Sequence, residues 1–182
     1  VLHAHAVVMW QTGNHQSAIT SLDKAVLLAQ TPVDLLLPLA QMHYTSGNIQ
    51  AALKTMQKLV TLSPDTPDTA INLGALLIEA GQYAEAYRHL QSAASYFPDN
   101  PDIYFNLGVA QKHVHKLSDT VQSYARAIML NPENPQYRLA HANALIEIQA
   151  YDEALIALND LDSRYPRNAD VLERLAFTLT QS

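Results

Sequence analysis

Apolar residues recur along this chain at helical spacing, in pairs of short amphipathic segments separated by turn residues. One such pair occupies residues 67–98. Its first segment has the i, i+3, i+4, i+7 face Ala70, Leu73, Gly74 and Leu77. Its second segment, after Gly81, has the face Tyr83, Ala86, Leu90 and Ala93. This spacing predicts two helices joined by a short turn and gives no sign of the period-two alternation of a strand.

The same pattern returns at an offset of 34 residues, without insertions. Small residues form one row: Ala6, Ala40, Gly74, Gly108, Ala142 and Ala176. A second row is alanine at Ala18, Ala52, Ala86 and Ala154, with Thr120 as its exception, and a third is proline at Pro64, Pro98, Pro132 and Pro166. We therefore expect a single array made of units 1–32, 33–66, 67–100, 101–134, 135–168 and a terminal helix at 169–182.

Glycines and capping residues mark the ends of the predicted helices. Gly13, Gly47 and Gly81 stand where the first helix of a unit should end in a left-handed residue. His115 and Gln149 replace this glycine in later units, at a cost of about 1 kcal/mol each. Helix starts are signalled by Thr66-Pro67-Asp68 and Asn100-Pro101-Asp102. Pro38 is a departure, because proline is tolerated only near the start of a helix.

The period and these rows resemble the tetratricopeptide repeat. The best match is Leu73-Gly74, Tyr83, Ala86, Leu90, Ala93 and Pro98, followed by Tyr104, Leu107-Gly108, Tyr124, Ala127 and Pro132. The resemblance covers the whole chain. It implies an all-α, right-handed superhelical solenoid of five helix-turn-helix repeats and one terminal helix. It also implies that the first helices line a concave groove that binds peptides or protein segments.

Family geometry places four apolar residues of the first helices in one row of this groove: Leu37, Ile71, Phe105 and Leu139. Tyr44 and Ile78 extend the row toward the helix ends, and Val109 belongs to a neighbouring row. One interpretation is an apolar channel for an amphipathic or extended segment. The other, about equally supported, is that these side chains pack against adjacent first helices. If the row faces solvent, Phe105→Glu should abolish partner capture and leave the thermal midpoint nearly unchanged.

Three amides and one lysine are further candidates for partner contacts. Asn72 and Asn106 stand one repeat apart and resemble the asparagine ladder of O-linked N-acetylglucosamine transferase repeats, which grips a peptide backbone. These amides could instead bond across neighbouring helices, and Asn143 lies in a different row. Lys112 and Arg174 are too few cations for the clamp by which related repeats hold C-terminal carboxylates.

Composition narrows the partner class. The net charge of −6, with 11 Lys and Arg, argues against nucleic acid. No apolar stretch approaches the roughly 20 residues that insert across a membrane. The eight histidines do not converge, because His3/His5 and His113/His115 are two residues apart on a helix. We therefore expect no metal, no cofactor and no enzymatic activity. With no cysteine the compartment is not identified, although the cytoplasm is slightly favoured.

The C-terminal segment has an apolar stripe made by Leu172, Ala176 and Leu179. In every earlier unit a second helix would cover this stripe, so we expect either continuation of the chain past Ser182 or a homo-oligomer through this end. The sequence thus predicts a protein–protein interaction scaffold with an apolar groove. One alternative is the recruiting region of a larger enzyme, such as a glycosyltransferase or sulfotransferase. Another is an assembly factor for a secretion, pilus or polysaccharide machine.

Overall fold

A computed structural model describes residues 2–30, 32–63 and 66–181 of the chain. Within these residues the protein is all-α, with eleven helices and no strand. Two residues of the sequence analysis lie outside the described residues. They are Pro64, a member of the proline row, and Ser182, past which the chain is expected to continue. The contacts divide the chain into two compact units, residues 1–82 and 83–182.

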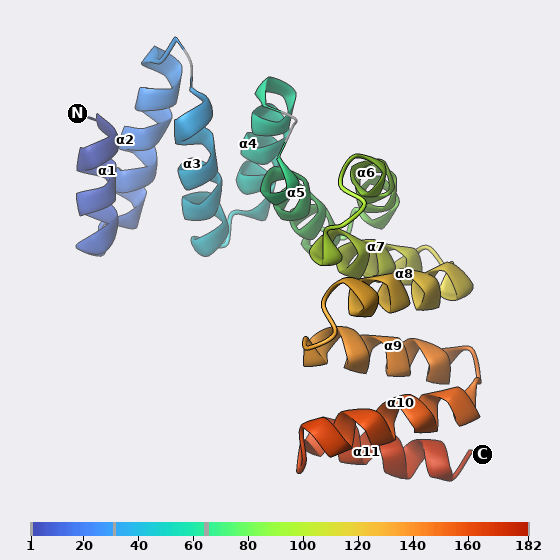
Figure 1. Cartoon of the computed structure of the whole chain (residues 1–182). Coiled ribbons are helices and arrows are strands. Elements are labelled where there is room, and N and C mark those ends of the chain that lie inside the picture. The colour runs from blue at the N-terminus through green and yellow to red at the C-terminus, as the bar shows by residue number, and fades with distance from the viewer. Residues whose placement is uncertain (1, 31, 64–65, 182) are drawn as a thin grey trace. The chain divides into compact units, whose positions relative to one another are not determined.

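The N-terminal unit contains five helices (Figure 1). They are α1 (Leu2–Gln11), α2 (His15–Leu28), α3 (Val33–Thr45), α4 (Ile49–Leu62) and α5 (Pro67–Glu79). Each helix packs against the next along the chain. The core lies between them and is made mainly by Leu22, Leu36, Met56 and Leu77, which are almost completely buried.

The C-terminal unit contains six helices (Figure 1). They are α6 (Tyr83–Tyr96), α7 (Pro101–His113), α8 (Leu117–Leu130), α9 (Pro135–Glu147), α10 (Tyr151–Arg164) and α11 (Ala169–Leu179). Successive helices again pack against one another. Ala142, Leu158, Leu161 and Val171 form a buried cluster among α9, α10 and α11, and Leu139 and Leu175 pack against it.

The helix bounds recur at the 34-residue period that the sequence predicts. The turn glycines Gly13, Gly47 and Gly81 have φ angles of 82°, 77° and 73°, and open space surrounds each of them. Glycine is therefore required there by backbone conformation and not by packing. His115 and Gln149 take the same left-handed conformation, with φ angles of 60° and 62°, as predicted.

The predicted caps are confirmed. Thr66 accepts a hydrogen bond from the Thr69 N–H, and Asn100 accepts from the Asp102 and Ile103 N–H groups. Two features depart from the regular repeat, the first of them as the sequence indicates. Pro38 lies well inside α3, so the carbonyl of Asp34 lacks its helical N–H partner. Arg167, in the turn before α11, has a φ angle of 67° that no sequence signal indicates.

Gly108, a member of the predicted row of small residues, allows an aromatic ring to approach the backbone of its helix. A Cβ atom added to Gly108 on α7 would lie 2.5 Å from a ring carbon of Tyr124 on α8. The ring therefore rests directly on the α7 backbone, and Tyr124 is buried. Burial raises the pKa of its hydroxyl to about 12, with a further contribution from the negative charge of Glu147.

Candidate protein-interaction site

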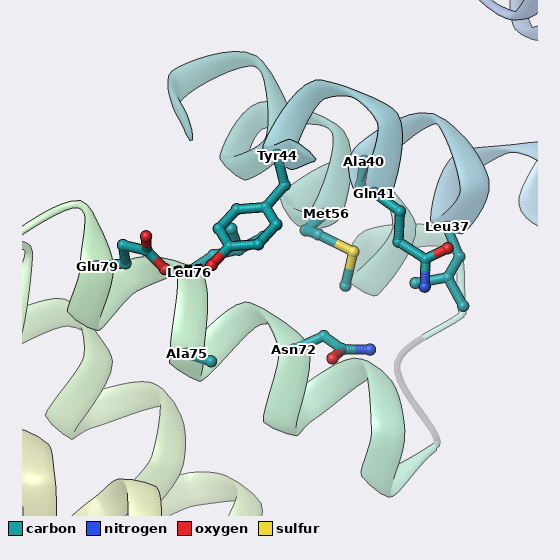
Figure 2. Close-up of a pocket in the computed structure, with 9 residues that line it drawn as sticks. All are labelled: Leu37, Ala40, Gln41, Tyr44, Met56, Asn72, Ala75, Leu76 and Glu79. Carbon is teal, nitrogen blue, oxygen red and sulfur yellow. Dashed lines mark hydrogen bonds between the residues drawn. The ribbon is translucent and has the colours of Figure 1, made fainter. Parts of the chain in front are cut away.

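A pocket of about 200 Å³ opens between α3 and α5 in the N-terminal unit. Its walls are made by Leu37, Ala40, Gln41 and Tyr44 of α3 and by Asn72, Ala75, Leu76 and Glu79 of α5. Met56 of α4 forms the floor, and in Figure 2 its side chain points into the space between the two first helices. The pocket is smaller than the roughly 300–1,000 Å³ of small-molecule sites, so it suits one side chain of a larger partner.

Two side-chain amides lie at the rim of this pocket. Figure 2 shows the amide groups of Gln41 and Asn72 facing the same opening from opposite helices. The asparagines Asn48, Asn100, Asn134 and Asn168 instead use their oxygens to cap helices. Within the described part of the chain, no hydrogen bond is recorded for either rim amide. An amide offers both a donor and an acceptor, which is what binding a peptide backbone requires.

One end of the pocket is closed by a hydrogen bond between the two helices. The hydroxyl of Tyr44 on α3 donates to Oε2 of Glu79 on α5 at 2.9 Å. This bond and the negative charge of Glu79 raise the pKa of the Tyr44 hydroxyl. The partner of Glu79 in this bond is thus a neutral hydroxyl and not a cation.

A second pocket of about 350 Å³ adjoins the first on the same surface. It is lined by Trp10 of α1 and by Pro38, Gln41, Met42, Tyr44 and Thr45 of α3. Gln41 and Tyr44 line both pockets, so they form the wall between them. The first helices of the N-terminal unit therefore present two adjacent cavities. This arrangement suits two anchor side chains of one extended segment.

The predicted groove residues of this unit are placed as follows. Leu37, Tyr44 and Asn72 come together around the α3–α5 pocket. Ile71 and Ile78 are half-buried on α5 and do not line it. Leu37 and Asn72 are half-buried as well, and Tyr44 is the exposed member of this set.

In the C-terminal unit, Phe105 and Leu139 are half-buried and pack against neighbouring helices, which supports the second interpretation of the row for these two residues. The Phe105 ring lies 5.6 Å from the ring of Tyr124 and 5.1 Å from that of Tyr137, and both tyrosines are buried. Leu139 packs against the core cluster of α9, α10 and α11. These two side chains help to hold neighbouring helices together, so Phe105→Glu would also reduce stability.

The remaining candidates of the C-terminal unit are one lysine in an ion pair and three half-buried residues. Lys112 forms an ion pair with Glu147, so its charge is already compensated within the unit. Asn106 and Val109 on α7 and Asn143 on α9 are half-buried. No hydrogen bond of the Asn106 or Asn143 amide is recorded among the described residues.

Sequence reasoning missed Met56 and Glu79 as parts of the site. Met56 belongs to the second-helix row Leu22, Met56, Leu90, Tyr124 and Leu158, which reads as core. Met56 is indeed only 1% exposed, although it forms the pocket floor. The available signal was the difference in size between Met56 and Tyr124 at equivalent positions. The sequence gives no signal that distinguishes Glu79 from the other acidic residues.

A third pocket, in the C-terminal unit, lies among α8, α9 and α10. Arg138 donates from Nη1 to Oδ2 of Asp160 at 2.7 Å there, next to His141, Ile128 and Ile156. Burial lowers the pKa of His141. No group of three or more metal-ligating side chains occurs among the described residues. Within the same residues, no helix combines the length and apolarity needed to cross a bilayer.

Comparisons with protein families agree with this architecture. Residues 74–113 match the family profile described as TPR repeat. Residues 11–93 match the profile described as anaphase-promoting complex, cyclosome, subunit 3. No curated protein matches the sequence. The chain is thus similar to TPR repeats over residues 74–113, in agreement with its helix pairs.

Solved structures share the fold. MamA from Desulfovibrio magneticus RS-1 superimposes with a TM-score of 0.82 at 17% identity, covering 92% of this chain and 95% of its own. A tetratricopeptide repeat protein from Parabacteroides merdae gives 0.87 at 20% identity, over 99% and 72% of the two chains. A thermophilic TPR protein from Thermus thermophilus gives 0.67 at 20% identity, over 98% and 97%. The protein therefore has the tetratricopeptide repeat fold.

That fold defines the class of protein. Stacked helix pairs create extended surfaces of first helices, and such repeats typically mediate protein–protein interaction. Proteins of this fold are generally scaffolds without enzymatic activity. The resemblance of Asn72 and Asn106 to O-linked N-acetylglucosamine transferase repeats rests on the residues alone.

Proposed function

We propose that this chain is an interaction scaffold that captures an extended segment of a partner protein on the first helices of its N-terminal unit. The observation that carries the proposal is the α3–α5 pocket, which has an apolar interior and two amides facing its opening. One side chain of the segment enters the pocket, while Gln41 and Asn72 bond to its backbone. The adjacent pocket beside Trp10 takes a second side chain.

The size of the pocket supports a peptide over a free small molecule. A cavity of about 200 Å³ buries one large side chain, which contributes about 1.5–3 kcal/mol. Two such anchors and two backbone hydrogen bonds at about 1 kcal/mol each give an affinity suited to reversible recruitment. Recruitment by a larger enzyme or by an assembly factor would use the same surface.

Selection from a displayed library of random dodecapeptides tests this proposal. The control is a double variant, Ala40→Gly with Met56→Tyr, which copies Gly108 and Tyr124 of the C-terminal unit and fills the pocket with a ring. Peptides retained by the unaltered protein should be lost from this variant, whose circular dichroism should remain helical. Selected peptides that bind both proteins equally would refute the α3–α5 pocket as the site.

A second proposal, self-association through α11, is favoured by a separate observation. Val171 is completely buried, whereas Leu172 and Leu179 are 48% and 63% exposed. Ala176 between them is also exposed. Two copies that covered these stripes would remove both leucines from water.

A further inference from the structure

The site between α3 and α5 has an equivalent two repeats further along, between α7 and α9. The shared period brings corresponding residues into pairs: Leu37 with Phe105, Ala40 with Gly108, Tyr44 with Lys112, Met56 with Tyr124, and Glu79 with Glu147. The repeat thus places two equivalent sites in one chain, one between α3 and α5 and one between α7 and α9. A comparison of their side chains shows which groups are missing from the α3–α5 site.

The C-terminal version is filled by aromatic rings. Tyr124 rests on Gly108, where an added Cβ would lie 2.5 Å from its ring, and Phe105 packs 5.6 Å from it between centroids. In the N-terminal version the corresponding residues are Met56 and Leu37, and neither carries a ring. There a pocket of about 200 Å³ is open in front of Met56. The N-terminal site therefore has room for the kind of group that the other site supplies internally.

The two sites also differ in charge. Glu147 is neutralised by an ion pair with Lys112. Glu79 receives the neutral hydroxyl of Tyr44, at 2.9 Å on Oε2. The helices α1, α3 and α5 carry the acidic residues Asp34, Asp68 and Glu79 and no lysine or arginine. The first-helix surface of this unit thus has an uncompensated negative charge beside an apolar pocket.

The amides follow a related pattern. Gln41 and Asn72 at the rim of the N-terminal pocket correspond to Val109 and Ala140 in the C-terminal unit, while Asn143 replaces Ala75. At the positions of Gln41 and Asn72 the filled site has apolar residues, and its own amide is Asn143. The open pocket thus has two amides at its rim that can bind a peptide backbone.

We propose that the α3–α5 pocket selects an extended protein segment in which an aromatic residue is followed or preceded by lysine or arginine. The ring enters the space that Tyr124 and Phe105 fill in the C-terminal unit. The cation pairs with Glu79 as Lys112 pairs with Glu147. This inference rests on the proposed function, because it specifies the partner of the same pocket.

Defined peptides test the inference. Capped hexapeptides of the form Gly-Ser-X-Y-Ser-Gly carry Phe, Leu or Ala at X and Lys, Gln or Glu at Y, and dissociation constants are measured by NMR titration of the full chain. The Phe-Lys peptide should bind about two- to five-fold more tightly than Phe-Gln, the range expected for one partly exposed ion pair. Phe-Glu should bind more weakly than Phe-Gln, and Ala-Lys should bind weakest of the lysine peptides.

Three variants distinguish the causes. Tyr44→Lys copies the Lys112 pairing, so it should abolish the preference for Lys over Gln while Phe is still preferred over Ala. Glu79→Gln should do the same. Glu147→Gln, an equal charge change at the equivalent position, should leave the preference unaltered. Binding that ignores Y in the unaltered protein would overturn the inference and leave the proposed function standing. Absence of binding by every peptide would overturn the inference, and the library selection then decides the proposed function separately.

Discussion

The hydroxyl of Tyr44 donates a 2.9 Å hydrogen bond to Glu79 across the first helices α3 and α5, and Lys112 pairs with Glu147 at the equivalent place between α7 and α9. The same repeat positions therefore join neighbouring first helices twice, once through a neutral donor and once through a cation. In the N-terminal unit this leaves a charged carboxylate at the mouth of an open pocket. The same repeat can thus carry one site that is filled by its own side chains, between α7 and α9, and one that is open, between α3 and α5.

The rim amides should contribute to binding and not to stability. Gln41→Ala with Asn72→Ala should weaken peptide binding by about 1 kcal/mol per lost hydrogen bond, with little dependence on the peptide's side chains. The thermal midpoint should stay nearly unchanged, because neither amide has a recorded partner among the described residues. Calorimetric titration measures the first quantity and a thermal melt the second.

Asn48→Ala is the matched control for the amides. Asn48 lies in the same unit, but its side chain accepts a hydrogen bond from the Ala51 N–H and caps α4. Its loss should cost about 1 kcal/mol of stability and leave peptide affinity unaltered. An unchanged affinity in the double variant would contradict the role given to Gln41 and Asn72.

Phe105 should be a stability residue. Phe105→Ala removes ring contacts with Tyr124 and Tyr137 and should lower the free energy of unfolding by about 3 kcal/mol. Leu37→Ala, at the equivalent position beside the open pocket, should lower it clearly less. Urea unfolding followed by circular dichroism measures both. Equal losses in the two variants would show that the sites are packed alike.

The helices and turns follow closely from the sequence, because capping and backbone conformation are local properties. Thr66 and Asn100 cap their helices, and His115 has a positive φ, as their positions in the repeat predict. The pocket does not follow from local pattern. It arises because Met56 fills less space than Tyr124, although both occupy a second-helix position that the repeat pattern assigns to the core. The contact of Phe105 with Tyr137 likewise depends on packing between repeats.

His141 should make the protein less stable in acid. Burial lowers its pKa below the ordinary 6.5, beside Arg138 and Asp160 in the same pocket. As pH falls below about 6.5, the unfolded chain binds a proton before the folded chain does, so stability decreases. His141→Leu, the residue found in this row at Leu39, Leu73 and Leu107, should reduce the loss between pH 7.5 and 5.5 by up to about 1 kcal/mol.

Urea unfolding at the two pH values measures this effect. His5→Leu is the control, since His5 holds the same repeat position but is exposed. That variant should keep the pH dependence of the unaltered protein. A pH dependence that His141→Leu does not reduce would mean that other groups control acid stability.

Self-association through α11 should depend on its exposed leucines. Light scattering over a concentration series should show a mass that rises with concentration, and Leu172→Asp or Leu179→Asp should abolish the rise. Leu27→Asp, at an exposed leucine of α2, is the control and should leave it intact. A mass that stays monomeric in the unaltered chain at every concentration would contradict this proposal.

The methyl resonance of Met56 gives the most direct test of the central claim, that the α3–α5 pocket receives a side chain of the partner. The chain has four methionines, so methyl-labelled methionine yields a spectrum that single substitutions can assign. Addition of the Phe-Lys hexapeptide should move the Met56 methyl upfield, because an aromatic ring would lie against it. Met129, which is 71% exposed in the C-terminal unit, should not move. A Met56 resonance that stays in place while the peptide binds would show that the segment docks elsewhere.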